Sequence, residues 1–136
     1  MKYNGIISKK IDIIYEELNL LQQFEQITIE QLAQDRIIKH ALERSLQICV
    51  ECMIDIANRI IALTDRAPTA TAAEAMNILE RLNIIKNAAV YKKMIQFRNF
   101  IVHRYESVDN EIIVSICKND LADFEMFIKE IQADND

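Results

Sequence analysis

The sequence predicts an all-α fold, an antiparallel bundle of four to five helices, built as a single domain over residues 1–136. Gly5 and Pro68 are the only glycine and the only proline, so the chain lacks the turn residues that hairpins and glycine-rich phosphate loops need. Apolar residues recur at helical intervals, and no useful stretch alternates with the period of a strand. Hydrophobic residues make up 51% of the chain, which is enough to build a core without disulfides.

The first helix is expected from about Asn4 to Gln26. Its apolar residues step by four and three positions, which places them along one face of a helix. This stripe, which we expect to face the core, consists of Ile7, Ile11, Ile14, Leu18 and Leu21.

The second helix is expected to be long and uninterrupted, from Thr28 to Thr64. Thr28 and Gln31 have the spacing of a capping box, in which each residue satisfies a backbone amide of the other. No glycine or proline follows before the segment 65–70, which contains Pro68 and is the clearest loop of the chain.

Three further helices are expected in the second half. Thr71, with a glutamate three positions later, opens a short third helix that ends near Asn83. Asn87 and Asp109 are suitable N-cap residues for the fourth and fifth helices. The polar pair at positions 119–120 is expected to interrupt the fifth.

Three charged residues of the second helix, Arg44, Glu51 and Asp55, share a narrow stripe with Ile37 and Ile48. Because the opposite side is also apolar, we expect this helix to be buried nearly all round and its charges to need partners. The charges either form an ion-pair network that fixes the fold or support a basic active-site residue elsewhere. A metal site is disfavoured because no third ligand is evident.

The three cysteines, Cys49, Cys52 and Cys117, are an odd number and show no metal-binding spacing, so we interpret them as core residues of a protein in the reducing cytoplasm. His40 has no obvious companion and is given no role. The longest apolar runs are far shorter than the roughly 18 residues that a membrane span needs, so we expect no contact with a membrane.

Charge is sorted along the chain. The net charge of −5 argues against nucleic acid, yet residues 81–104 carry six Lys or Arg residues and no Asp or Glu. Residues 1–80 have a net charge of −4 and residues 105–136 a net charge of −7. One edge of the bundle is therefore expected to be basic and to bind phosphate-rich RNA, with Lys92, Lys93 and Arg104 as candidate contacts.

The basic segment ends in Arg98-Asn99-Phe100-Ile101-Val102-His103-Arg104-Tyr105, which concentrates groups capable of phosphate chemistry. Asn99 and His103 are one helical turn apart and share a face. Arg98 and His103 differ by about 140° on an ideal helix. For the two to meet, the helix must loosen near His103, or each must complete a site with a second subunit.

This R-x4-H motif, with a polar residue after the arginine and followed by x-Tyr, resembles the signature of HEPN domains of the HepT-like kind. The resemblance extends to Arg44-Ser45-Leu46-Gln47, Glu51 and Asp55-Ile56-Ala57 of the long helix and so covers most of the chain.

The resemblance implies a toxin of a type VII toxin–antitoxin system, a homodimeric, metal-independent endoribonuclease that needs no cofactor. Arg98 and His103 are the implied catalytic residues, and Asn99 is the polar residue of the motif. The implied partner is an MntA-like nucleotidyltransferase antitoxin, which transfers AMP to Tyr105. The dimer and its antitoxin can then form a larger hetero-oligomer.

The residue types suit this chemistry. Histidine titrates near neutrality and can act as base or acid, and arginine holds phosphate while staying cationic. Two alternatives remain: Arg98 can instead be a structural ion-pair partner of Glu51 or Asp55, and the chain can be a catalytically silent HEPN subunit that binds a nucleotidyltransferase or a nucleotide.

Overall fold

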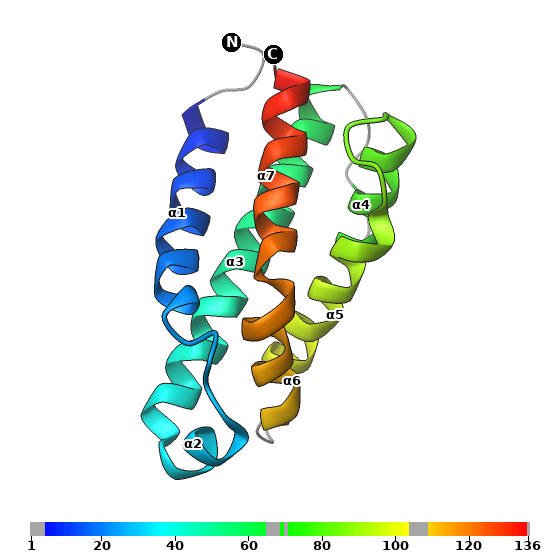
Figure 1. The fold of residues 1–136 in the computed structure, drawn as a ribbon. Helices are drawn as coiled ribbons and strands as arrows, with labels where there is room; N and C mark the ends of the chain where they lie inside the picture. Colours follow the sequence, from blue (N-terminus) through cyan, green and yellow to red (C-terminus); the bar gives the residue numbers. More distant parts are fainter. Residues whose placement is uncertain (1–4, 65–68, 70, 104–108, 136) are drawn as a thin grey trace.

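The computed structural model describes residues 5–64, 69, 71–103 and 109–135, and every regular element in these ranges is helical, as predicted (Figure 1). The elements are α1 (Gly5–Gln22), α2 (Ile29–Gln34), α3 (Arg36–Leu63), α4 (Ala72–Arg81), α5 (Ala88–His103), α6 (Asn110–Ser115), the π-helical turn η1 (Ile116–Asp120) and α7 (Leu121–Asn135).

The long helices α1, α3 and α7 pack against one another along the length of the bundle (Figure 1). Helices α4 and α5 pack together beside α3, and α5 also contacts α7. The predicted stripe of the first helix lies in the core, where each of its five residues is no more than 8% exposed. Among the described residues, no helix is both long enough and apolar enough to cross a bilayer.

The prediction of one uninterrupted second helix was wrong, because the chain breaks at Asp35 into α2 and α3. The Asp35 carboxylate accepts hydrogen bonds from the backbone amides of Ile37 and Ile38, both at 3.1 Å. Its backbone is extended, with φ −133° and ψ 92°, so Asp35 ends one helix and caps the next. A search for glycine and proline misses a break that is made by a capping side chain.

The predicted starts of the helices after the first are confirmed, whereas Asn4, the expected start of the first, lies outside the described residues. Thr28 forms the full capping box with Gln31, and Thr71, Asn87 and Asp109 each accept a hydrogen bond from a backbone amide of the helix that follows. Asn83, at φ 60°, lies just beyond the end of α4. The expected interruption of the last helix is the π-helical turn η1, which ends at Asp120. Most of the loop at 65–70 lies outside the described residues.

The expectation that the long helix is buried nearly all round was also wrong. Ile37 is 82% exposed, the Asp55 side chain is 52% exposed, and Arg44 is exposed. The opposite side of α3 is buried as expected and includes Leu46 and Met53. Neighbouring helices cover one side of α3, so charges on its other side remain hydrated and need no buried partners.

The three cysteines are buried and unpaired, as predicted. Burial raises the pKa of the Cys117 thiol to about 11 and that of the Cys49 thiol further. Both therefore stay protonated at neutral pH and behave as small apolar residues of the core.

Candidate functional site

The start of α5 is held by side-chain oxygens that accept its backbone amide protons. Glu80 accepts from Ala88 at 3.0 Å, and Asn87 accepts from Ala89 at 3.1 Å. The first amides of a helix have no partner within the helix, so these two acceptors replace water at that end. The start of α5 is thereby fixed relative to α4.

Glu130 of α7 joins the same end of α5 to α7. One of its carboxylate oxygens accepts from the backbone amide of Lys86 at 2.8 Å, and the other accepts from the hydroxyl of Tyr91. Tyr91 is fully buried, and its ring meets Phe127 edge-on at 5.0 Å. Burial and the Glu130 carboxylate raise the pKa of Tyr91, so the phenol remains a donor.

Arg98 lies two turns after Tyr91 on nearly the same face of α5. It is therefore directed toward the interior and is half-buried. Its Nε atom is buried and has no hydrogen-bond acceptor within the described part of the chain. Arginine stays cationic and has four further N–H donors besides the one on Nε, so the half-buried guanidinium can still bind an anion through them.

Asn99 follows on the next face and is exposed. It lines a shallow hollow of about 430 Å³ between α4 and α5, together with the two predicted RNA-binding lysines, Lys92 and Lys93. The other lining residues carry no negative charge: Ala73, Ala89, Ile95 and Gln96. The structure thus brings Asn99 and both lysines to one cationic surface.

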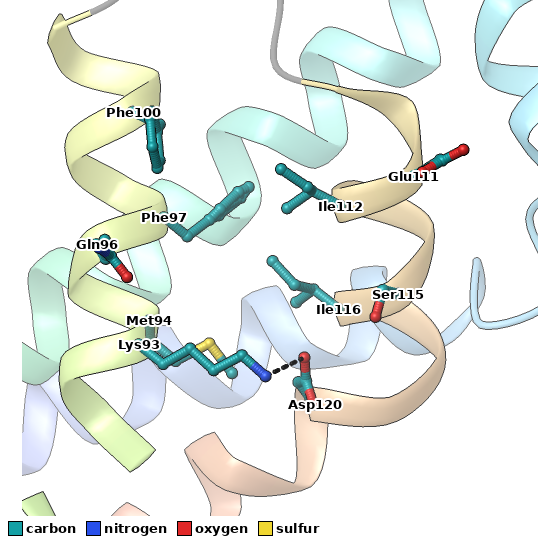
Figure 2. A pocket seen from close by; sticks show the side chains of 10 residues that line it. All are labelled: Lys93, Met94, Gln96, Phe97, Phe100, Glu111, Ile112, Ser115, Ile116 and Asp120. Carbon is teal, nitrogen blue, oxygen red and sulfur yellow. Dashed lines mark ion pairs between the residues drawn. The ribbon is translucent and has the colours of Figure 1, made fainter. Parts of the chain in front are cut away.

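A second hollow, of about 340 Å³, lies on the other side of α5, between α5 and the α6–η1 segment (Figure 2). Phe97 and Phe100 of α5 face Ile112 and Ile116 across it. Figure 2 shows Lys93 reaching across one end toward Asp120, with 4.0 Å between the lysine Nζ and the nearer carboxylate oxygen.

His103 is the last residue of α5. By helical register its position follows Asn99 by one turn and Gln96 by two, whereas Arg98 lies about 140° away. Because α5 remains helical through His103, loosening before that residue does not bring the two positions together. The His103 side chain, and the whole of Arg104 and Tyr105, lie outside the described residues.

The charged stripe of α3 has partners other than Arg98. Asp55 forms an ion pair with Lys10 of α1 at 3.0 Å, and this carboxylate raises the lysine pKa through their hydrogen bond. Glu51 accepts a hydrogen bond from Gln47 at 2.9 Å, one turn earlier in the same helix. No ion pair or hydrogen bond joins Arg98 to either carboxylate in the part of the chain that the structure describes.

Sequence reasoning missed two features of this region. Gln96 lines both hollows, although nothing in the sequence distinguishes it from other exposed glutamines. Ile112 is 42% exposed at the second hollow, although its apolar side chain is of a kind usually buried in the core. Its neighbour Ile113, which is fully buried, is the residue that packs in the core. Within the described ranges, no three His, Cys, Asp or Glu side chains converge as metal ligands would.

Comparison with known proteins gives a consistent result over almost the whole chain. The family model described as "Ribonuclease HepT-like" matches residues 14–131. The mRNA nuclease HepT of Shewanella oneidensis is 32% identical over 133 residues, which cover 96% of this chain and 99% of the relative. The tRNA nuclease HepT of Aphanizomenon flos-aquae is 23% identical, covering 94% and 88% of the two chains.

Among solved structures, the tri-AMPylated HEPN toxin of Shewanella oneidensis in complex with an MNT antitoxin superposes with a TM-score of 0.87. It is 32% identical to this chain, and the match covers 96% of this chain and 99% of the toxin. The similarity therefore extends to the arrangement of the whole bundle.

Proposed function

Because the chain belongs to the ribonuclease HepT-like family, we propose that it is the toxin of a type VII toxin–antitoxin system and cleaves RNA in the cytoplasm. The observation that carries the proposal is the surface of α5. There Lys92, Lys93 and Asn99 line one cationic hollow, and the R-x4-H motif completes the same helix.

The chemistry needs no metal and no cofactor. His103 takes the proton of a ribose 2′-hydroxyl as that oxygen attacks the adjacent phosphorus, and an acid returns a proton to the departing 5′-oxygen. Arg98 stabilises the added negative charge of the pentacoordinate phosphorane, and Asn99 orients a phosphate oxygen or the imidazole. The bond from phosphorus to the 5′-oxygen breaks as the bond to the 2′-oxygen forms.

A second copy of the chain is needed to bring an arginine and a histidine of the motif to the same phosphate. Arg98 and His103 diverge by about 140° on a helix that stays regular between them, so a single α5 does not direct both at one phosphate. In a two-fold homodimer, the arginine of one subunit and the histidine of the other can meet in a cleft. The two His103 imidazoles can then divide the base and acid roles.

The toxin is neutralised by an MntA-like nucleotidyltransferase antitoxin that transfers AMP to Tyr105. Support comes from the Shewanella oneidensis relative, whose structure is that of a tri-AMPylated toxin in complex with an MNT antitoxin. Each added AMP brings bulk and a negative charge beside a cationic surface, which repels RNA. The toxin dimer and its antitoxin assemble into a larger hetero-oligomer.

Glu51 and Asp55 have structural roles in this proposal, whereas Arg44 is exposed on α3 and takes no part in the chemistry. The contacts of the two carboxylates, with Lys10 and Gln47, join α1 to α3 and neighbouring turns of α3. Arg104 adds a further cationic group next to His103 for RNA.

The test is cleavage of a mixed RNA pool by the purified chain, without its antitoxin, in excess EDTA. We expect cleavage with 2′,3′-cyclic phosphate ends, because the 2′-oxygen is the nucleophile. A folded dimer that leaves RNA intact would contradict the enzyme and support the alternative, a silent subunit that binds the nucleotidyltransferase or a nucleotide.

The modification is tested separately by incubating the chain with its cognate nucleotidyltransferase and ATP. We expect AMP mass on the peptide that contains Tyr105 and none on a Tyr105→Phe protein. Full modification of the Tyr105→Phe protein would remove Tyr105 as the acceptor. His103→Ala, which keeps the tyrosine, is the matched control and is expected to be modified normally.

A further inference from the structure

The hollow between α5 and the α6–η1 segment has two aromatic side chains on one wall. Phe97 is 7% exposed and forms its base, whereas Phe100 is 43% exposed (Figure 2). The opposite wall is aliphatic, and Ile112 on that wall is 42% exposed. Apolar side chains that stay accessible in a hollow of about 340 Å³ favour a planar apolar ligand over solvent.

Polar groups are confined to the rim of this hollow. Gln96 lies on the α5 side and Ser115 on the α6 side, while Lys93 and Asp120 approach each other at one end. Glu111 also lines the hollow, but its carboxylate points away from it. A nucleobase has the same distribution, with apolar faces and a polar edge. The amide, hydroxyl and carboxylate of the rim can donate to or accept from that edge.

The hollow is continuous with the surface assigned above to the RNA backbone. Lys93 and Gln96 line it and also line the cationic hollow that contains Lys92 and Asn99. A single strand of RNA that crosses α5 can therefore place its phosphates on Lys92 and Lys93 and one of its bases in the hollow beside Phe100. Phe100 lies one residue after Asn99, so this base belongs to a nucleotide close to the cleaved phosphate.

We propose that the hollow formed by Phe97, Phe100 and Ile112 is a nucleobase subsite, which binds one unpaired base of the RNA substrate. The inference rests on the proposed ribonuclease function. It adds to that function a preference for single-stranded RNA, because a paired and stacked base cannot enter.

The test measures RNA affinity with the His103→Ala protein, which cannot cleave its ligand. The probe is a fluorescein-labelled single-stranded oligoribonucleotide, followed by fluorescence anisotropy. We expect Phe100→Ala to weaken binding roughly 5- to 100-fold, since stacking on an aromatic side chain contributes on that scale. Phe100→Leu keeps the apolar volume without the ring and should recover only part of the loss.

A matched series of oligonucleotides isolates the base. Abasic sites are placed at each position in turn, and at one position they should weaken binding to the parent protein but not to the Phe100→Ala protein. Met126→Ala is the control, because it removes a similarly exposed apolar side chain from α7.

Three outcomes would overturn the subsite. Phe100→Ala could leave affinity unchanged, or weaken intact and abasic RNA equally. It could instead convert a dimer to a monomer in light scattering, which would make the hollow an interface between copies. Ile112→Gln, on the exposed part of the other wall, repeats the test if Phe100→Ala fails to fold. If the His103→Ala protein binds no RNA at all, the ribonuclease proposal itself fails.

Discussion

The two ends of α5 are built differently. At its start, Glu80, Asn87 and Glu130 hold the backbone and the Tyr91 hydroxyl, and Ala88 and Tyr91 are buried. Toward its end, Asn99 and Phe100 are exposed and Arg98 keeps a buried Nε without an acceptor. The hydrogen bonds at the start of α5 therefore hold in place the end that carries the residues we propose for catalysis.

The largest expected effect comes from removing the histidine at the end of α5. His103→Ala should lower the rate of RNA cleavage by about 10²–10⁴-fold, the usual contribution of a general base or acid. The melting temperature should stay nearly unchanged, because the substitution is far from the anchors of α5. Initial rates and thermal denaturation measure the two effects.

His40, the other histidine of the chain, provides the matched control, because it is exposed on α3. His40→Ala should retain full activity. If His103→Ala also retained it, the end of α5 would not be the catalytic end.

A substitution at the anchored start of α5 should lower stability and leave the rate of RNA cleavage unchanged. Tyr91→Phe removes the hydroxyl that Glu130 accepts from, leaves the Phe127 contact in place, and should lower the free energy of unfolding by about 1–3 kcal/mol. The rate of RNA cleavage per folded molecule should not change, since Tyr91 touches no part of the site. A large drop in that rate at a temperature where the protein is folded would contradict the assignment of a purely structural role to the start of α5.

The fold was largely predictable because its determinants are local. Cap residues such as Thr28 and Asp109 are recognised from neighbours within three positions, and the buried stripe of α1 follows from period alone. Asp35 was not recognised as a cap, because an aspartate is also compatible with the interior of a helix. Only the path of the chain in the structure shows that Asp35 begins α3. The outward direction of Arg44 depends on which helices surround α3.

The site was predictable in part. The motif supplied the residues that we propose for catalysis, and the charge of residues 81–104 predicted the cationic surface that contains Lys92 and Lys93. The hollow between Phe100 and Ile112 could not be inferred, because those residues are 12 positions apart in the sequence and on helices that meet only through tertiary packing. The direction of Arg98 toward the interior depends likewise on the buried position of Tyr91 two turns earlier.

A smaller effect on stability is expected at high pH. The pKa of Tyr91 is raised in the folded state, so its stabilising contribution is complete below the unfolded-state pKa of about 10 and is lost as pH rises beyond it. The difference in unfolding free energy between wild type and Tyr91→Phe should narrow by just under ~1 kcal/mol at about pH 10.5. Urea unfolding across this pH range measures it.

Both proteins should also lose stability from about pH 8.5, because the buried thiols ionise only when the chain unfolds. That shared decline is the internal control. A constant difference between the two proteins up to pH 11 would mean that Tyr91 ionises as readily in the fold as outside it.

The smallest expected effect concerns one lysine of the cationic hollow. Lys92→Gln should weaken binding of single-stranded RNA about threefold at physiological salt and reduce the slope of log affinity against log salt by about 0.7, the value for one phosphate contact. Lys9→Gln, at an exposed lysine of α1, should change neither. Because the slope counts phosphates and is insensitive to base stacking, it separates this hollow from the one beside Phe100. An unchanged slope for Lys92→Gln would show that the RNA backbone does not contact the hollow between α4 and α5. The proposed path by which a base reaches Phe100 would then be wrong as well.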